Sequence, residues 1–355
     1  MEAIVLVGGQ GTRLRPLTLT RPKPMLPAAG VPFLTHQLAR AKASGIDHVV
    51  LATSYRPEVF TDHFGDGSSL GLRIDYCTEV EPLGTGGGIR NVADRLDGGQ
   101  DEPVVVFNGD VLSGHDIAAQ VAAHRAASAA VTLHLVRVDD ARAFGSVPTG
   151  PDGQVTAFVE KSPTPVSDQI NAGCYVFTRS VIDAIPAGRV VSVERDTFPQ
   201  LLAEGAVVLG HVDASYWLDV GTPAAYVQAS ADLVRGVVGS PAVATAADRM
   251  QADGADVAPT ATVSGGSFVD DGSVVDAGAN VDGSIVMAGA RVGKGATILR
   301  SVLGRGADVG PGCVLVDAVI GDGARLGAGN ELRAGARVWP DVVLGDVAVR
   351  FSSDV

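Results

Sequence analysis

Cysteine and aromatic residues are scarce in this 355-residue chain, at three residues and 5% respectively. Cys77, Cys174 and Cys313 are odd in number and widely spaced, and no C-x-x-C pair is present. This pattern favours buried, reduced thiols in a cytosolic protein over a disulfide framework. Because charged residues make up only 19% and apolar residues 46%, the composition also argues against a disordered chain or a coiled coil.

Positive charge and long apolar runs are lacking as well. The net charge is −13, and no basic patch of the kind expected for a general nucleic-acid binder dominates. No window approaches the roughly 18 apolar residues of a membrane span. The start, "MEAIVLVGG", has no basic segment typical of a signal peptide. We therefore expect a soluble cytoplasmic protein without nucleic-acid or membrane partners, in which any local positive charge serves a small anionic ligand.

Lysine is the rarer cation, since only Lys23, Lys42, Lys161 and Lys294 are lysines among 27 Lys and Arg residues. Lys42 lies in an amphipathic helical stretch and Lys294 at a predicted turn, which is typical of solvated charge. Lys23 stands between two prolines and Lys161 follows a glutamate. These two settings indicate a role for a compact point charge.

The first two-thirds of the chain alternates between two kinds of segment. Valine-rich runs at Ile4–Val7, His48–Thr53 and Pro103–Asp110 predict buried strands. Phe33–Gly45 and His115–Ala127 between them predict helices. Such alternation indicates an α/β domain with a Rossmann-like mixed, mostly parallel sheet, whose ligands bind at the carboxyl ends of strands.

A different rhythm follows a small, polar segment at Gly236–Asp256, which predicts a linker. Aliphatic residues then recur six apart at Val257, Val263, Val269, Val275 and Val281. A 17-residue spacing follows in Val281, Ile298, Leu315 and Leu332, and in Val292, Val309 and Leu326. Three hexapeptides with an occasional residue dropped make one coil, so the pattern predicts a left-handed parallel β-helix with glycines at its corners.

The predicted domains are thus a catalytic domain at 1–235, a linker at 236–256 and a β-helix with a cap at 257–355. The cap is the segment from Val338 to Val355, whose Trp339, Pro340 and Phe351 are bulky or rigid. Because a stack of coils leaves unpaired backbone at its ends, we expect this segment to cap the helix or dock on a neighbour. No histidine follows His211, which argues against an acyltransferase site in the coils and favours an assembly role.

The stretch "GGQGTRLRP" places glycines and arginines directly after the first predicted strand. It is not a P-loop, because no Gly-Lys-Ser/Thr follows, and Leu14 replaces the third glycine of a dinucleotide fingerprint. Consecutive glycines let backbone N–H groups approach phosphates. Arg13 can form paired hydrogen bonds to phosphate oxygens, and Lys23 adds a further positive charge.

These residues resemble the signature of the sugar-1-phosphate nucleotidyltransferases, and the resemblance covers essentially the whole chain. The motifs, in family order, are "GGQGTRLRPLTLTRPKPMLP", "PLGTGGGI", "NGD", "FG", "FVEKS", "NAGCYVF", "SVERDTFP" and "WLDVGTP", followed by the β-helix. The resemblance is greatest to bacterial members that act on mannose-1-phosphate with GTP. It implies attack of a sugar-1-phosphate oxygen on the α-phosphorus of a nucleoside triphosphate, with pyrophosphate leaving.

The resemblance also implies roles for individual residues. Arg13, Lys23 and Lys161 would be catalytic, and Asp110 and Asp219 would hold Mg²⁺, which prefers carboxylate oxygens. The nucleotide would contact Leu6, Gly8, Gly9, Gly11, Thr12, Arg13, Gly84, Thr85, Gly86 and Asp110. The sugar phosphate would contact Gly109, Asp110, Gly145, Glu160, Lys161, Asn171, Gly173 and Asp219.

Three alternatives remain open at the level of sequence. The loop "GTGGG" differs from the Gly-Leu-Ala-Gln type of thymidylyl-transferring relatives, which favours a purine nucleotide by analogy. The same chemistry could nevertheless use glucose-1-phosphate with dTTP or UTP, or heptose-1-phosphate with GTP. A catalytically silent, nucleotide-sugar-sensing subunit should lack a charged site residue, whereas Arg13, Lys23, Asp110, Lys161 and Asp219 are all present.

Overall fold

The computed structural model describes residues 1–244 and 246–350, so Phe351 of the predicted cap lies outside the described residues. The chain forms two compact units. The first comprises residues 1–9 and 37–217, and the second comprises residues 10–36 and 218 onward. This division differs from the predicted domains, because the segment 10–36 belongs with the C-terminal part of the chain.

The first unit is built on a seven-stranded sheet in the order β10-β8-β9-β6-β1-β4-β5. Its strands are β1 (Glu2–Leu6), β4 (His48–Thr53), β5 (Arg73–Thr78), β6 (Pro103–Asn108), β8 (Val131–Arg137), β9 (Gln169–Thr178) and β10 (Val208–Val212). Only β9 runs antiparallel to its neighbours, β6 and β8. The predicted mostly parallel sheet and its first strands are therefore confirmed.

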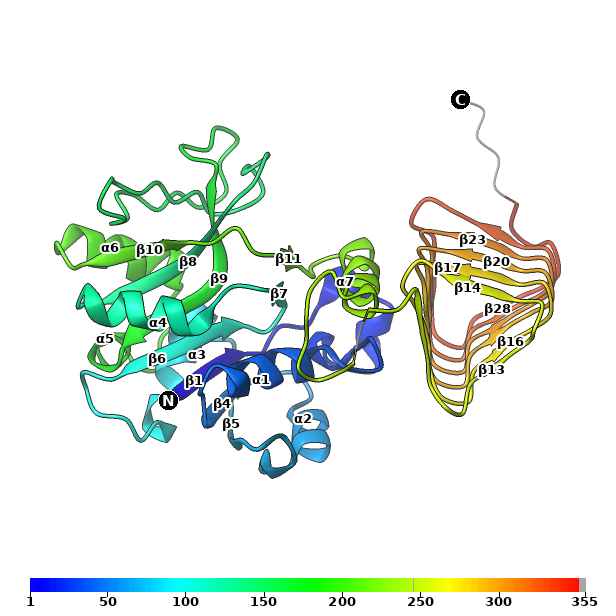
Figure 1. Ribbon diagram of the computed structural model, residues 1–355, viewed down its shortest axis with the longest axis horizontal. Helices are drawn as coiled ribbons and strands as arrows, with labels where there is room; N and C mark the ends of the chain where they lie inside the picture. Colours follow the sequence, from blue (N-terminus) through cyan, green and yellow to red (C-terminus); the bar gives the residue numbers. More distant parts are fainter. Residues whose placement is uncertain (245, 351–355) are drawn as a thin grey trace. The chain divides into compact units, whose positions relative to one another are not determined.

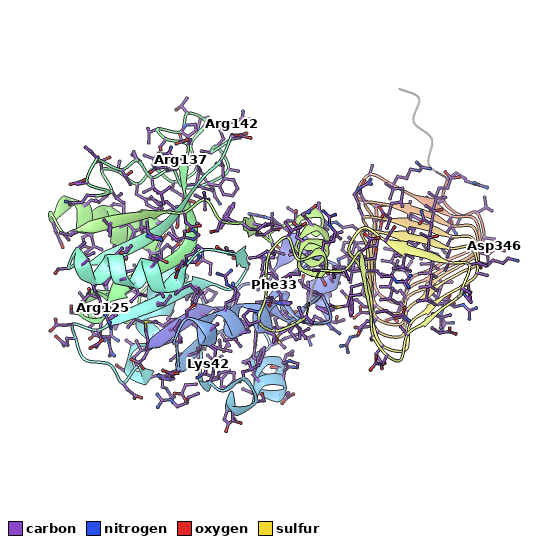
Figure 2. The ribbon with its side chains drawn as sticks, viewed as in Figure 1. Phe33, Lys42, Arg125, Arg137, Arg142 and Asp346 are labelled. Atoms are coloured by element: carbon purple, nitrogen blue, oxygen red, sulfur yellow. The ribbon has the colours of Figure 1, made fainter. Side chains whose placement is uncertain are left out.

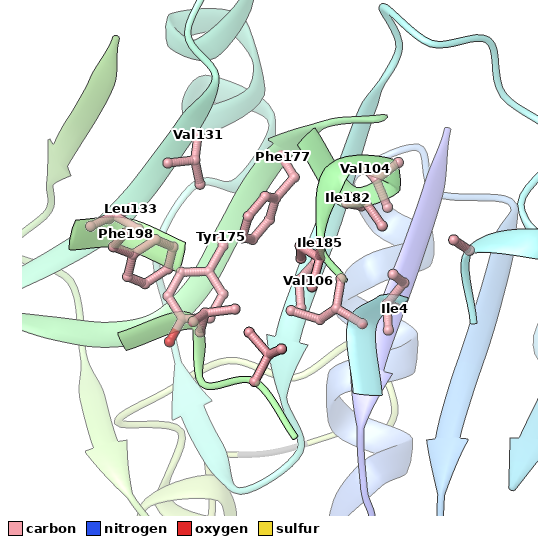
Figure 3. Packing of buried hydrophobic residues seen from close by; sticks show 14 of the residues in the cluster. Ile4, Val104, Val106, Val131, Leu133, Tyr175, Phe177, Ile182, Ile185 and Phe198 are labelled. Atoms are coloured by element: carbon pink, nitrogen blue, oxygen red, sulfur yellow. The ribbon is translucent and has the colours of Figure 1, made fainter. Parts of the chain in front are cut away.

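Helices cover both faces of this sheet. The helices of the chain are α1 (Phe33–Ala43), α2 (Pro57–Phe64), α3 (Gly84–Asn91), α4 (Ile117–Ala126), α5 (Arg179–Ala184), α6 (Phe198–Ala203) and α7 (Pro223–Arg235). Tyr175 and Phe177 of β9 join the apolar core with α3, α5 and Phe198 (Figure 3). Cys174, on the opposite face, contacts Gln120 of α4. Successive side chains of β9 thus point to opposite faces of the sheet and pack into the layers on both sides.

The second unit begins with a loop of short turns at residues 10–36. Its elements are the 3₁₀ turns η1 (Thr12–Leu14), η2 (Leu17–Leu19) and η3 (Lys23–Met25), and the strands β2 (Pro27–Ala28) and β3 (Val31–Pro32). Helix α7 packs against β2 and against the first coils of the β-helix. We call residues 10–36 the signature loop. Two further short strands are β7 (Val111–Ser113), in the first unit, and β11 (Trp217–Asp219).

The rest of the second unit is the predicted parallel β-helix, whose stacked coils have three sides (Figure 1). One sheet holds β12 (Arg249–Gln251), β15 (Ser267–Val269), β18 (Ile285–Val286), β21 (Val302–Leu303), β24 (Val319–Ile320) and β27 (Arg337–Val338). A second holds β13 (Asp256–Val257), β16 (Val274–Val275), β19 (Arg291–Val292), β22 (Asp308–Val309), β25 (Arg325–Leu326) and β28 (Val343–Leu344). The third holds β14 (Thr262–Ser264), β17 (Asn280–Asp282), β20 (Thr297–Leu299), β23 (Val314–Val316) and β26 (Glu331–Leu332).

The 17-residue spacing sets the strand register of the third sheet, because residues 17 apart pair on neighbouring strands. Val281 pairs with Ile298 and Ile298 with Leu315, and all three side chains are buried in the prism. Gly289 and Gly306 at the corners have positive φ, as expected. The first coil begins at β12, inside the segment predicted as a linker.

Several surface arginines of the first unit pair with carboxylates. Figure 2 shows Arg125, Arg137 and Arg142 on the outside of this unit. Arg137 pairs with Asp168 at 2.6 Å and Arg142 with Asp140 at 2.6 Å. Among the described residues, no helix is both long and apolar enough to cross a membrane.

Candidate active site

The turn after β1 and the turn after β6 lie against each other in the first unit. Gly109 donates its N–H to the Leu6 carbonyl at 3.0 Å. A Cβ on Gly109 would lie 2.6 Å from that oxygen and 2.7 Å from Cγ1 of Val7. Only glycine allows this approach, which places Asp110, the predicted metal ligand, beside the carboxyl end of β1.

Gly8 and Gly9, two more of the predicted nucleotide glycines, follow β1 at the same strand end. Ser54, directly after β4, donates its hydroxyl to the Gly8 carbonyl. Val7 extends the pairing of β1 through a 3.0 Å hydrogen bond to Ala52. Gly9 is exposed. The carboxyl ends of β1, β4 and β6 therefore form one edge, as the parallel arrangement predicts.

The predicted loop at Gly84, Thr85 and Gly86 is the start of α3. Gly86 donates its N–H to the Val191 carbonyl at 2.8 Å, and Thr85 donates its hydroxyl to Glu194 at 2.8 Å. The Val193 N–H in turn donates to Thr85 at 2.9 Å. Thr85 is thus held by the "SVERDTFP" segment, and Glu194 is a residue that the sequence prediction of the site missed.

The predicted sugar-phosphate residues of the first unit also converge. The Asn171 N–H donates to the Gly145 carbonyl at 2.9 Å, and a Cβ on Gly145 would lie 3.0 Å from Oε2 of Glu160. The Gly173 N–H donates to Oδ1 of Asn171 at 3.1 Å. Nζ of Lys161 lies 3.8 Å from Glu160. Gly145, Glu160, Lys161, Asn171 and Gly173 therefore share one neighbourhood.

Tyr175 and Asn108 were missed as well, although both lie in quoted motifs. Asn171 donates its side-chain N–H to the Tyr175 hydroxyl at 2.8 Å, and burial raises the pKa of that phenol well above its ordinary value. A Cβ on Gly173 would lie 2.8 Å from the Asn108 amide nitrogen. The phenol stays neutral and orients Asn171.

The signature loop supplies the remaining residues, in the second unit. Gly11 has φ of 60°, and a Cβ there would lie 3.0 Å from Cβ of Lys23 and 3.0 Å from Thr18. Thr18 donates its hydroxyl to the Gly11 carbonyl at 2.8 Å. The prolines beside Lys23 are buried and place it at the start of η3. Lys23 therefore lies beside the glycine turn.

The side chains of Arg13 and Asp219 both lie close to Gly221 in the second unit. A Cβ on Gly221 would lie 3.2 Å from Oδ2 of Asp219 and 3.5 Å from Nη1 of Arg13. Thr12 and Arg13 form the first turn of η1 and are exposed. The predicted site residues thus form two sets, one in each unit, with Asp110 in the first and Asp219 in the second.

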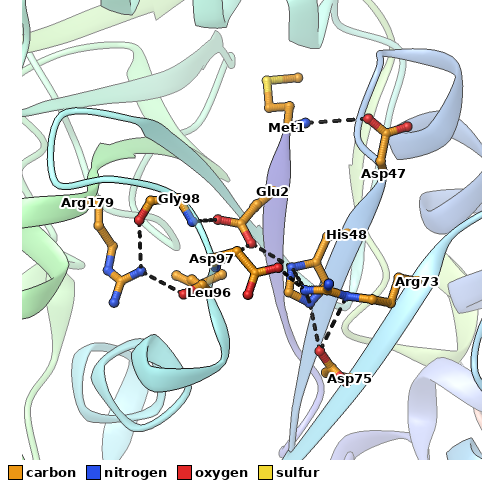
Figure 4. Close-up of polar contacts among 10 residues, drawn as sticks. All are labelled: Met1, Glu2, Asp47, His48, Arg73, Asp75, Leu96, Asp97, Gly98 and Arg179. Atoms are coloured by element: carbon orange, nitrogen blue, oxygen red, sulfur yellow. Dashed lines mark hydrogen bonds and ion pairs between the residues drawn. The ribbon is translucent and has the colours of Figure 1, made fainter.

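A separate carboxylate–histidine cluster lies at the opposite, amino-terminal ends of β1 and β4 (Figure 4). Nδ1 of His48 lies 2.6 Å from Glu2, and Nε2 lies 2.9 Å from Asp75. Nη2 of Arg73 lies 2.5 Å from Asp97 and 2.8 Å from Nδ1 of His48. Because the guanidinium occupies the centre, this cluster is a salt-bridge network and not a metal centre.

Two histidines buried in the first unit, His115 and His134, stay neutral. His115 and His134 stack with ring centroids 3.8 Å apart. Burial lowers the pKa of His115 to about 4 and that of His134 to about 2. The three cysteines are free thiols; Cys174 and Cys313 are buried as expected, whereas Cys77 is only half-buried.

An α/β sheet with glycine-rich turns at its strand ends, a loop that carries arginine and lysine, and a β-helix define the class of protein. The chain is a member of the nucleotidyl transferase family, which its residues 2–236 match. Residues 249–348 match the GlmU-like C-terminal hexapeptide family.

Particular relatives narrow the comparison. The chain is 58% identical over 357 residues to the mannose-1-phosphate guanylyltransferase of Mycobacterium tuberculosis, covering 100% of this chain and 99% of the relative. Mannose-1-phosphate guanylyltransferase 1 of Arabidopsis thaliana is 39% identical over 64% of this chain and 63% of the plant protein. The crystal structure of HddC from Yersinia pseudotuberculosis complexed with GMP-PN is 28% identical, with a TM-score of 0.55, over 64% of this chain and 97% of that one.

Proposed function

We propose that this protein transfers a guanylyl group from GTP to mannose-1-phosphate, giving GDP-mannose and pyrophosphate. The observation that carries the proposal is the 58% identity to a mannose-1-phosphate guanylyltransferase over both units. All the charged residues that the motifs predict are present, which argues against a silent regulatory subunit.

In the proposed reaction, an oxygen of the sugar phosphate attacks the α-phosphorus of GTP in line. The new P–O bond forms as the bond to the β-phosphate bridging oxygen breaks, and pyrophosphate carries away the electron pair. The nucleophile is already anionic near neutral pH, so no general base is needed. Catalysis then depends on bringing two polyanions together and stabilising the leaving charge.

We assign the triphosphate to the signature loop. Backbone N–H groups at its Gly11 turn can donate to phosphate oxygens, and Arg13 and Lys23 supply the positive charge. The base and ribose would contact the start of α3. Glu194 holds Thr85 there, so we include Glu194 as a positioning residue for that segment.

We assign the sugar phosphate to the second neighbourhood of the first unit. Lys161 would bind its phosphate and Glu160 a sugar hydroxyl, while Asn171, with its amide held by Tyr175, would contact the ring. The anionic nucleophile and Lys161 would then be held in one geometry before the reaction, which lowers its entropic cost.

Members of this family use a divalent metal ion, and we propose Mg²⁺ with Asp110 and Asp219 as its carboxylate ligands. Both side chains are partly exposed and offer the hard oxygen donors that Mg²⁺ requires. Bound there, the ion would neutralise charge on the reacting phosphates. We further propose a cytoplasmic location and a homo-oligomer formed through the β-helix.

The proposal is tested with a panel of four nucleoside triphosphates against mannose-, glucose- and heptose-1-phosphate, assayed by pyrophosphate release. We expect GTP with mannose-1-phosphate to give the highest kcat/KM. A second candidate is heptose-1-phosphate with GTP. A maximum for dTTP or UTP with glucose-1-phosphate would overturn the assignment of base and sugar.

A further inference from the structure

One arginine of the β-helix binds the backbone of the signature loop. Nη1 of Arg337, at the start of β27, donates to the carbonyl oxygen of Arg13 at 2.9 Å and to that of Arg15 at 2.7 Å. The two carbonyls flank the end of η1, whose last turn is closed by the Arg15 N–H to the Thr12 carbonyl. A single guanidinium nitrogen thus bridges the backbone on both sides of the turn that carries Arg13.

A second coil of the β-helix binds the loop a few residues further on. Thr20 donates its hydroxyl to Oδ2 of Asp322 at 2.9 Å. Asp322 is itself held, because its Oδ1 accepts the N–H of Arg305 at 2.9 Å. Two successive coils therefore contact the signature loop through side chains.

The far end of the signature loop is held by α7 and lies against the first two coils. The Tyr226 hydroxyl donates to the Pro27 carbonyl, and the Ala29 N–H donates to Oγ of Ser230 at 3.1 Å. A Cβ on Gly30 would lie 3.4 Å from the ring of Phe268. These contacts belong to the general packing of the second unit and do not involve Arg13. The Arg337 contact, by contrast, is confined to the turn that carries Arg13, the proposed phosphate-binding side chain.

We propose that Arg337 is a positioning residue, which holds the signature-loop turn so that Arg13 and the backbone N–H groups of that turn are preorganised for the triphosphate. The β-helix then contributes to substrate binding as well as to assembly. This inference rests on the proposed function, because it assigns the triphosphate to that loop. The physical reason is that a turn fixed before binding loses less conformational entropy when the nucleotide arrives.

The test compares the full-length variants Arg337→Ala and Arg291→Ala with the parent protein. Arg291 is the matched control, since it is an exposed arginine of the same β-helix that pairs with Asp276 at 2.8 Å inside the coils. Steady-state kinetics, Tm and recovery in millimolar guanidinium chloride are measured for each. A hydrogen bond to a charged group contributes about 1.5–3 kcal/mol, so kcat/KM for GTP should fall about 10- to 100-fold in Arg337→Ala.

The expected pattern separates positioning from folding. KM for the sugar phosphate should stay at the parent value and Tm should fall by no more than a few degrees. Guanidinium ion should restore part of the lost kcat/KM, and Arg291→Ala should behave like the parent. Thr20→Val, which keeps the side-chain shape but removes the Asp322 bond, is a second probe. Thr20→Val should lower kcat/KM for GTP by a smaller factor than Arg337→Ala does.

Kinetic constants for Arg337→Ala equal to those of Arg291→Ala would overturn the inference. So would a uniform loss in both substrates that parallels a fall in Tm in both Arg337→Ala and Thr20→Val. If the parent protein prefers another sugar or base, the proposed function fails, while the same comparison with the preferred pair still decides the role of Arg337.

Discussion

Lys161 combines an unusual backbone with an accessible charge. Its φ is 28°, in the left-handed region that non-glycine residues rarely adopt, and its side chain is 58% exposed. Such backbone strain persists only where surrounding contacts impose it, and it is frequent at ligand-binding positions. Lys42 is a contrasting lysine, because it pairs with Asp47 at 3.0 Å on an ordinary helix surface.

Replacing Lys161 with alanine should therefore impair the reaction without unfolding the protein. Removal of one preorganised contact to a developing charge commonly costs ~10²–10³ in rate, and we expect a loss of kcat/KM of that order. Pyrophosphate release measures it. Lys42→Ala is the control and should keep the parent kcat/KM. A near-normal kcat/KM for Lys161→Ala would show that Lys161 is an ordinary surface charge.

Asp219 is the residue that tests the proposed metal site. In Asp219→Asn the side chain keeps its shape and loses its charge, so turnover should drop by at least about 100-fold while Tm stays within a few degrees. Activity of the parent protein should vanish in EDTA and return with Mg²⁺. Equal turnover in EDTA and in Mg²⁺ would exclude the proposal.

At the scale of elements, the turn after β6 depends on one glycine. In Gly109→Ala the new methyl group would meet the Leu6 carbonyl oxygen at 2.6 Å, and backbone cannot yield as a side-chain end can. We expect a loss of about 1–3 kcal/mol in the free energy of unfolding, with reduced kcat/KM, since Asp110 moves with the turn. Urea titration measures the first quantity.

Gly99 provides the matched control for this turn. A Cβ there meets nothing within 4 Å, so Gly99→Ala should change the free energy of unfolding by no more than about 0.5 kcal/mol. Equal stability of the two variants would show that the turn after β6 relaxes without cost.

The carboxyl group of Glu2, at the amino-terminal end of β1, makes the stability of the protein depend on pH. Burial by itself raises the pKa of Glu2, but hydrogen bonds from the Asp97 and Gly98 N–H groups and from His48 outweigh it and lower the pKa below 4.5. A depressed carboxyl pKa contributes stability that is present above the unfolded value and is lost as pH falls through the folded value.

Glu2→Gln should accordingly have a lower free energy of unfolding than the parent at pH 6. The gap between the two free energies should shrink as pH falls below 4.5. Urea titrations across this range measure the gap. Asp62→Asn, on an exposed position of α2, should show no such narrowing. A gap that stays constant down to pH 3 would contradict the assignment to Glu2.

At the scale of the whole molecule, the last coil exposes apolar side chains. Trp339 is 47% exposed and Val343 70% exposed. The chain beyond them partly caps the stack, because the Val349 N–H donates to Asn330 at 2.8 Å and Arg350 pairs with Glu331 at 2.6 Å. The polar backbone is satisfied there, while the apolar side chains remain available to another copy.

If the coils assemble the protein, light scattering should give a multiple of 36.1 kDa for the full chain. The double variant Trp339→Glu and Val343→Glu should reduce the mass toward one chain, because each carboxylate would be desolvated at an interface. Val190→Glu, at an exposed apolar position of the first unit, should leave the mass unchanged. A single-chain mass for the parent protein would exclude assembly.

The sequence by itself determined the features that depend on short, repeated spacing. The burial of Val281, Ile298 and Leu315 follows from a 17-residue period, because each coil repeats the environment of the last. The strand-end turns were predictable for a similar reason, and the proposed site residues lie in the same motifs. Their glycines, carboxylates and lysines lie within motifs whose chemistry is local.

Only the tertiary structure decided how distant segments share contacts. Arg337 reaches the Arg13 carbonyl across 324 positions, and Glu194 holds Thr85 across 109. The antiparallel course of β9 and the grouping of the signature loop with the β-helix are of the same kind. No periodicity or local motif encodes such pairs, because their members lie far apart in the chain. In the Arg337 contact the side chain also bonds a backbone carbonyl, which leaves no complementary residue type at the other position.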